Sequence, residues 1–263
     1  MILKYKNGLN FFIFSKLATF PEIRHGIFTR TWCDGRKPCN NLNVGLNAGD
    51  DEKRVKQNRA RIAGCMGGSD LVFANQVHGT NILIFDKNKP RSTPQPDDPS
   101  QPGNPALTGD AMVTNIQGKF IAIQQADCQA ILIYDPRKKV IANVHAGWRG
   151  NIKNIIGKCL ESMQNNFNCD PQQMVAAISP SLGPCCSEFK NYKTEIDKKY
   201  WQYKNKYDHF NLWAMTTDQL LDVGLQRKNI ELSNICTKCN DHMFFSYRKT
   251  NQTGRFVSVI GLK

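Results

Sequence analysis

The sequence predicts one mixed α/β domain in which the strands pair largely antiparallel. Short apolar segments rich in β-branched residues recur along the 263 residues, and turns rich in Gly, Asn and Asp separate them. Only about four segments have helical periodicity, and they are unevenly spaced among the strands. Strands that do not alternate regularly with helices favour antiparallel pairing over a repeated parallel β-α-β arrangement.

In the N-terminal third, one helix is expected among several strands. An Asn7-Gly8 pair is typical of a hairpin turn, and Asp50 is placed to cap a polar helix over residues 51–63. His78, Gly79 and Thr80 lie between two predicted strands. The strands expected in this third are residues 4–5, 10–15, 25–30, 71–77 and 81–85.

Residues 87–107 differ in composition from the rest of the chain. Six of the twelve prolines fall here, among Ser, Gln and Asp. Such a segment cannot bury a core, so we expect an exposed, mobile loop within a single domain spanning residues 1–263.

After this loop, strands dominate again around one strong helical pattern. Apolar residues at helical spacing over residues 151–167 predict a helix with Cys159 in the core. Two further helices are expected over residues 187–200 and 216–227. The strands expected here are residues 109–114, 119–124, 130–134, 140–144, 174–178, 230–235 and 255–262.

The strands at 130–134 and 140–144 are joined by a polar turn and predict a hairpin. Cys128 precedes the first strand and His145 follows the second, so antiparallel pairing would make a thiolate and an imidazole neighbours. Arg149 follows where the chain enters the predicted helix. A helix N-terminus with a guanidinium favours an anion site.

Composition limits the class of protein. The formal net charge of +13 comes from dispersed basic residues with no run of five, which favours attraction of anionic substrates over nucleic-acid binding. No apolar run is long enough to span a membrane, and residues 11–14 are too short for a signal-peptide core. The ten irregularly spaced cysteines are expected to be reduced, and the protein cytoplasmic.

His78, Cys128 and His145 form the central constellation. Three nitrogen and sulfur ligands are what a catalytic zinc ion takes, although spacings of 50 and 17 residues are not a recognised zinc signature. Cys128 and His145 could instead be a nucleophile and its base, with Asp127 as the orienting group. A buried thiol with two core histidines is the plainer alternative.

Several other residues carry weaker indications. Arg149 is interpreted as an anion-binding residue or a salt-bridge partner, and Arg30 carries a weaker version of the same argument. Cys236-x-x-Cys239 is half of a zinc-binding pattern, which Cys185-Cys186 or Cys33 and Cys39 could complete. Without a second Cys-x-x-Cys pair this pattern is weak.

Taken together, the motifs resemble those of the YfiH family, long labelled multicopper polyphenol oxidase or laccase and associated with purine nucleoside phosphorolysis. The resemblance covers essentially the whole chain. The motifs are, in order, residues 25–30 (HGIFTR), 42–46 (LNVGL), 49–51 (GDD), 58–59 (NR), 76–79 (QVHG), 109–114 (GDAMVT), 126–128 (ADC), 145–150 (HAGWRG), 178–186 (ISPSLGPCC), 244–248 (FFSYR) and 253–255 (TGR).

The resemblance implies a four-layer α/β/β/α sandwich with a catalytic zinc ion on His78, Cys128 and His145. It implies cleavage of adenosine, inosine and S-methyl-5′-thioadenosine by phosphate to the free base and (methylthio)ribose 1-phosphate, with adenosine deamination as a side activity. In this reading Arg149 holds phosphate and Asp127 shuttles a proton. The residues expected to contact substrate are Arg30, Asn43, Gln76 and Arg149.

This chain departs from the family pattern in two places. Residues 32–35 (WCDG) stand where Gly-rich residues usually follow the Thr-Arg motif, which leaves the contacts of Arg30 open. The Pro-rich segment at 87–107 resembles an insertion relative to the family pattern, and we expect it to be peripheral to the site.

Other functions stay open at this point. A multicopper oxidase needs about ten histidines, mostly in His-x-His pairs, whereas this chain has five and no such pair. Copper could still replace zinc at the same three ligands. A Cys–His amidase that edits peptidoglycan precursors and a basic RNA-binding protein are the remaining classes. We expect a monomer that binds purine nucleosides and phosphate, with no membrane and no nucleic-acid partner.

Overall fold

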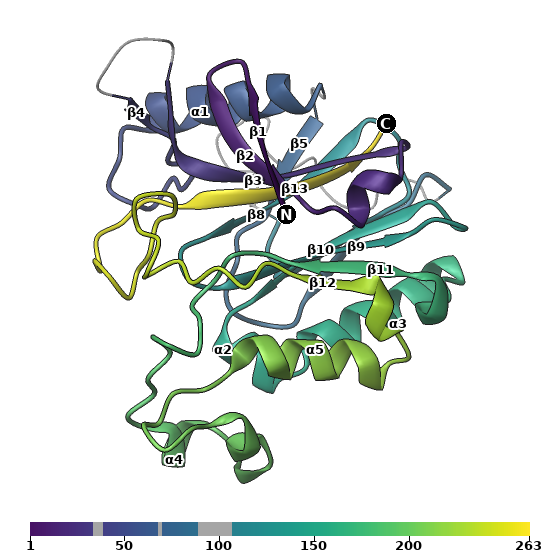
Figure 1. The fold of residues 1–263 in the computed structure, drawn as a ribbon. Helices are drawn as coiled ribbons and strands as arrows, with labels where there is room; N and C mark the ends of the chain where they lie inside the picture. Colours follow the sequence, from purple (N-terminus) through teal and green to yellow (C-terminus); the bar gives the residue numbers. More distant parts are fainter. Residues whose placement is uncertain (34–38, 68–69, 89–106) are drawn as a thin grey trace.

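Two mixed sheets pack face to face, and helices cover both outer faces (Figure 1). The computed structural model describes residues 1–33, 39–67, 70–88 and 107–263. The four layers follow the order α/β/β/α, as the resemblance implied, with α1 on one side and α2, α3 and α5 on the other. The two sheets share one apolar core, as the strands of a single domain do. That residues 1–263 form a single domain stays a prediction.

The first sheet has seven strands in the order β1-β2-β3-β13-β8-β5, with β4 paired to β3. Only the β5–β8 pair is parallel among the strands described. The Asn7-Gly8 turn joins β1 to β2 as predicted, with φ of 52° and 79° at the two residues. The strands are β1 (Ile2–Lys6), β2 (Leu9–Ile13), β3 (Ile23–Trp32), β4 (Asn40–Asn41), β5 (Asp70–Phe73), β8 (Lys119–Gln125) and β13 (Phe256–Leu262).

The second sheet has six strands in the order β12-β11-β9-β10-β7-β6. The β6–β7 and β11–β12 pairs are parallel, and β9 and β10 form the predicted antiparallel hairpin. Its strands are β6 (Ile82–Phe85), β7 (Ala111–Thr114), β9 (Gln129–Asp135), β10 (Val140–Ala146), β11 (Val175–Ile178) and β12 (Ile230–Leu232).

Strand alternation divides the apolar residues among three layers of core. In β8, Ile121 and Ile123 face the core between the sheets, whereas Phe120 and Ala122 face α1. The same alternation in β9 sends Leu132 inward and its neighbours toward α3. Strands buried on both faces are continuous apolar runs, which is why they were visible in the sequence.

The helices are α1 (Glu52–Met66), α2 (Trp148–Ile152), α3 (Ile155–Phe167), α4 (Tyr192–Glu195) and α5 (Leu212–Asp222). In the described part of the chain, four short 3₁₀ helices accompany them, at Leu17–Thr19, Pro171–Gln173, Lys198–Tyr203 and Arg227–Asn229. The described residues contain no helix long and apolar enough to cross a membrane.

Helix boundaries are where the sequence predictions were least accurate. The helix expected over 151–167 is broken at Asn154, which has φ of 53° and caps α3 by accepting a hydrogen bond from the Gly157 N–H. Asp51 rather than Asp50 caps α1, which continues to Met66 until Gly67 adopts a left-handed conformation.

Two predictions in the C-terminal half were wrong in extent. The helix expected over residues 187–200 consists only of α4 and a 3₁₀ turn, Lys198–Tyr203. The next helix begins at Leu212, earlier than expected, because the Asn211 side chain caps it.

The expectation of fully reduced cysteines was wrong at one pair, because Cys33 and Cys39 form a disulfide. The other eight cysteines are free. Most of the Pro-rich segment predicted to be a mobile loop, residues 89–106, lies outside the described residues.

Candidate active site

The β9–β10 hairpin brings the first two predicted ligands together. His145 pairs with Ala130 across the hairpin, and Cys128 lies just before β9 at the same end. The register therefore juxtaposes thiol and imidazole as the sequence predicted. The third residue, His78, comes from the connection between β5 and β6, which links the two sheets.

A buried carboxylate, Asp110, shapes the turn that carries His78. Its Oδ1 accepts a hydrogen bond from the His78 N–H at 2.9 Å, and its Oδ2 accepts from the N–H groups of Val77 at 3.2 Å and Gly79 at 2.7 Å. His78 itself has φ of 58°, a conformation that costs free energy in a residue with a Cβ. The three hydrogen bonds offset that cost.

The same carboxylate orients His145. Asp110 Oδ1 lies 2.8 Å from His145 Nδ1, and both side chains are buried. Nδ1 is thereby occupied, so Nε2 is the atom left for a metal or a substrate. Asp110 lies in the motif at residues 109–114 but was not predicted to have a role, and its place directly before β7 was the available signal.

The protonation states of Cys128 and His145 depend on each other. Burial by itself raises the pKa of the Cys128 thiol, but the charge of His145 and hydrogen bonds from both histidines lower it to about 6. Burial lowers the pKa of His145, but the Cys128 charge and the Asp110 hydrogen bond raise it to about 9. These opposite shifts favour a thiolate on Cys128 beside an imidazolium on His145.

The donor atoms have the spacing that a tetrahedral metal ion requires. The ligand atoms of His78, Cys128 and His145 lie within 4.8 Å of one another, and His78 Nε2 is 3.7 Å from Cys128 Sγ. Zinc bonds of about 2.3 Å to sulfur and about 2.0 Å to nitrogen give a nitrogen–sulfur edge of about 3.5 Å. The residues present thus fit a zinc ion.

Gly147 leaves the room that this arrangement needs. A Cβ at this position would lie 2.8 Å from His78 Cδ2 and 3.0 Å from Cys128 Sγ. The glycine that follows β10 is therefore required by the close approach of the His78 and Cys128 side chains rather than by its backbone conformation, since its φ is −74°.

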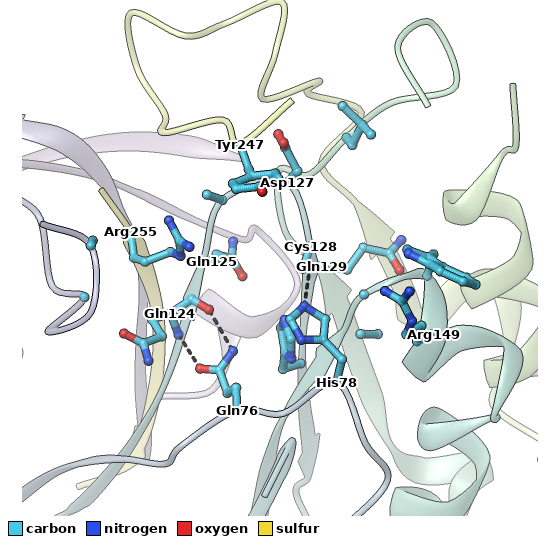
Figure 2. A pocket seen from close by; sticks show the side chains of 18 of the residues that line it. Gln76, His78, Gln124, Gln125, Asp127, Cys128, Gln129, Arg149, Tyr247 and Arg255 are labelled. Carbon is cyan, nitrogen blue, oxygen red and sulfur yellow. Dashed lines mark hydrogen bonds between the residues drawn. The ribbon is translucent and has the colours of Figure 1, made fainter. Parts of the chain in front are cut away.

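The three residues line a cavity of about 770 Å³, within the size range of small-molecule sites. Its walls are strongly basic and partly aromatic. The charged side chains are Arg59, Arg149, Arg248 and Arg255 against Asp127, and the aromatic ones are Phe73, Trp148, Phe189 and Tyr247. Figure 2 shows Arg149 on one side of His78 and Cys128, and Gln76, Gln124 and Arg255 on the other.

Arg149 lines the cavity, but not at the N-terminus of a long helix. It belongs to the five-residue α2, stacks over the Trp148 ring at 4.2 Å, and lies 4.0 Å from Glu195. The expected helix-terminus contribution to anion binding therefore falls away, and any attraction for an anion comes from the guanidinium.

The residues expected to contact substrate fall into two groups. Gln76 lines the cavity, although its amide is paired with the backbone N–H and C=O of Gln124 (Figure 2). Arg30 and Asn43 are not among the described residues that line it. Arg30 stacks on Phe245 at 4.7 Å, and the buried Asn43 accepts a hydrogen bond from the Arg255 N–H.

Asp127 lines the cavity with both carboxylate oxygens engaged. Oδ1 accepts a hydrogen bond from Thr237 Oγ1 and Oδ2 accepts one from the Arg248 N–H, each at 2.6 Å. Asp127 also has φ of 87°, so the residue beside Cys128 is held in an unusual conformation by these contacts.

A residue that the sequence analysis missed is Gln125. It is 1% exposed and lines the cavity, and its Nε2 donates to Ser179 Oγ. Its Oε1 has no hydrogen-bond partner among the described residues. A buried acceptor left unpaired at a cavity wall is suited to a polar group of a ligand.

Fold and site together define the class: a two-sheet α/β/β/α protein with a Cys–His₂ metal-type site at a basic cavity. Comparison with known proteins then identifies the family. Residues 24–263 match the family described as multi-copper polyphenol oxidoreductase laccase, and the chain belongs to it.

Similar proteins of this family are named for purine nucleoside chemistry rather than for laccase activity. The chain is 29% identical over 256 residues to "Purine nucleoside phosphorylase YlmD" of Bacillus subtilis, covering 92% of this chain and 89% of that one. It is 31% identical over 235 residues to "Adenosine deaminase RL5" of an unknown prokaryotic organism, covering 84% and 86%. The crystal structure of YlmD from Geobacillus stearothermophilus superposes with a TM-score of 0.82 at 26% identity, covering 100% of this chain and 99% of that one.

Proposed function

We propose that this protein is a zinc-dependent purine nucleoside phosphorylase with adenosine deaminase side activity. The substrates would be adenosine, inosine and S-methyl-5′-thioadenosine, cleaved by phosphate to the base and (methylthio)ribose 1-phosphate. The observation that carries the proposal is the convergence of His78, Cys128 and His145, oriented by Asp110, at a cavity walled by arginines. The printed names of the relatives support it.

Zinc on these three ligands would act as a Lewis acid toward an oxygen of phosphate or water. The chain's own residues supply binding and orientation. Arg149 lines the cavity beside His78 and Cys128 (Figure 2), where its guanidinium could hold phosphate against the sugar. Loss of the base develops positive charge on the sugar, which the bound phosphate dianion stabilises.

The base and ribose would be held by the other walls. Trp148, Phe189 and Tyr247 line the cavity and would supply aromatic contacts to a base, and the unpaired Oε1 of Gln125 could accept a hydrogen bond from a hydroxyl or amino group. Deamination needs a proton shuttle, and Asp127 stays our candidate for it. Arg30 and Asn43 are proposed to act indirectly, through the residues they hold.

The proposal keeps the remaining sequence predictions as expectations. The enzyme would act as a cytoplasmic monomer on small molecules, with no nucleic-acid partner. Copper could occupy the same ligands, and metal analysis of the purified protein identifies the ion.

The test measures adenine and hypoxanthine from adenosine by chromatography, with and without phosphate, for wild type, Cys128→Ala and Arg149→Gln. We expect phosphate-dependent adenine release, abolished in Cys128→Ala. Arg149→Gln should raise the KM for phosphate about tenfold or more while metal content is unchanged, because one charge-assisted hydrogen bond is lost. Adenosine turnover that is absent in a zinc-loaded, folded wild type would refute the proposal.

One observation favours a second candidate, a thiol hydrolase. The metal-free site has a thiol whose pKa is lowered to about 6, a neighbouring imidazole and a buried carboxylate behind it, which is the order of a Cys–His–Asp triad. A thiol amidase, including one acting on peptidoglycan precursors, would keep its activity after chelation and form an acyl-enzyme on Cys128. The phosphorylase would lose its activity under chelation.

A further inference from the structure

A second cluster of metal-ligating side chains lies outside the three ligands already described. It consists of Cys185, Cys186, Cys236 and Cys239, whose sulfur atoms all lie within 4.8 Å of one another. The first two follow β11 and the last two follow β12. We propose that these four cysteines bind a structural zinc ion that joins the two segments.

The sulfur spacing fits a tetrahedral tetrathiolate. Cys239 Sγ lies 3.7 Å from Cys185 Sγ and 3.5 Å from Cys186 Sγ. Zinc–sulfur bonds of about 2.3 Å in a tetrahedron place sulfur atoms about 3.8 Å apart. A disulfide requires about 2.05 Å, so no two of these thiols are bonded to each other.

Backbone hydrogen bonds hold the two segments of the cluster next to each other. Ser181 and Cys236 form a parallel bridge, in which the Ser181 N–H donates to the Ile235 C=O and the Thr237 N–H donates to the Ser181 C=O. A turn closed by the Cys186 N–H to the Gly183 C=O then brings both adjacent cysteines to the same point.

The chemistry of the donors selects the ion. Four thiolates are soft ligands that favour zinc over the hard ions, and four protein ligands leave no open position for substrate. The site would therefore be structural and distinct in kind from the three-ligand site, where a position stays open. Two of the four cysteines are exposed, so the ion can enter from solvent.

The ion would brace one wall of the cavity. Arg248, which lines the cavity, donates from its guanidinium to the C=O of Cys186 and Glu188. Thr237 lies between the two ligands of the second segment and donates to Asp127, next to Cys128. Loss of the ion should loosen the segments that hold these residues, so we expect lower thermal stability.

The test counts metal in full-length protein purified under reducing conditions without added metal. Wild type should contain two zinc ions per chain, Cys128→Ala one, and the Cys185→Ser/Cys239→Ser double variant one. The Cys33→Ser/Cys39→Ser double variant, which changes two cysteines outside both clusters, should keep two. X-ray absorption spectroscopy at the zinc edge of Cys128→Ala should show only sulfur neighbours around zinc, at about 2.3 Å.

The outcomes separate this inference from the proposed function. No zinc in Cys128→Ala, or nitrogen among its zinc neighbours, overturns the tetrathiolate site and leaves the phosphorylase proposal standing. Zinc bound only by sulfur in Cys128→Ala, together with no adenosine turnover by the zinc-loaded wild type, supports this site while refuting the other proposal. Because Cys128→Ala keeps all four cysteines, the result does not depend on whether the double variant folds.

Discussion

Replacing Asp110 by Asn tests whether one buried carboxylate builds the three-ligand site. The carboxylate accepts four hydrogen bonds, from three backbone N–H groups of residues 77–79 and from His145. An Asn side chain has nearly the same shape but turns one oxygen into an N–H donor. Whichever way the amide is oriented, it faces two of the four donors with an N–H group.

The cost can be estimated from these contacts. Hydrogen bonds to a charged group contribute about 1.5–3 kcal/mol each, so the loss of two predicts a decrease of roughly 3–6 kcal/mol in the free energy of unfolding. His145 also loses the carboxylate that fixes its tautomer. Removing such a partner typically lowers metal affinity by about 10- to 100-fold.

The measurements are urea unfolding of the metal-free protein and zinc titration against a competing chelator. Asp135→Asn is the matched control. Asp135 is equally buried and accepts from three backbone N–H groups, of Arg137, Lys138 and Asp170, at the opposite end of β9. If the Asn amide oxygen faces Arg137 and Lys138, only the hydrogen bond from Asp170 is lost. The free energy of unfolding should then fall by about 1.5–3 kcal/mol, with no effect on zinc affinity at the three-ligand site. Wild-type zinc affinity in Asp110→Asn, or equal affinity losses in both variants, would refute the reasoning.

Three further predictions address other parts of the chain. Gly147→Ala should lower zinc affinity at the three-ligand site at least tenfold with little change in thermal stability, because its Cβ would displace His78 and Cys128; an unchanged affinity in the same chelator titration contradicts this. Burial lowers the pKa of His25 to about 4. The unfolded chain therefore binds the proton first, and about 3 kcal/mol of stability present above pH 6.5 is lost as the pH falls toward 4. Urea unfolding of His25→Gln should show a shallower loss over that window, and parallel curves for the two proteins would argue against the assignment. Asp127→Asn should reduce adenosine deamination more than phosphorolysis if Asp127 shuttles a proton, and Thr237→Val, which removes only its partner, serves as control; equal losses in both reactions and both variants would indicate positioning alone.

The sequence predicted the parts of the site that depend on local patterns. Two apolar runs around a polar turn predict a hairpin, and antiparallel pairing then requires Cys128 and His145 to meet. Helical spacing likewise placed Cys159 in the core, where it is fully buried. These inferences needed only the period of the apolar residues and the geometry of one turn.

Other features depend on contacts between distant segments, which periodicity does not report. Arg30 was expected at the substrate because it ends a short strand, but β3 continues to Trp32 and the guanidinium donates to the Asp241 C=O. The four cysteines after β11 and β12 meet only because those strands are parallel neighbours. Nothing local in the sequence signals the Arg30 contact, and the Cys236-x-x-Cys239 pattern left two candidates to complete it, Cys185-Cys186 or Cys33 and Cys39.

Asp127 shows how the two cysteine-containing sites are joined through the backbone. Its C=O accepts a hydrogen bond from the Leu182 N–H, close before Cys185, and its carboxylate accepts one from Thr237, between Cys236 and Cys239. A residue with φ of 87° keeps that conformation only while its partners hold it. Since Cys128 is the next residue, the position of one proposed metal ligand depends on segments that the tetrathiolate site would fix. A structural ion bound by cysteines that are distant from Cys128 in the sequence would then affect the reaction by fixing the position of Cys128.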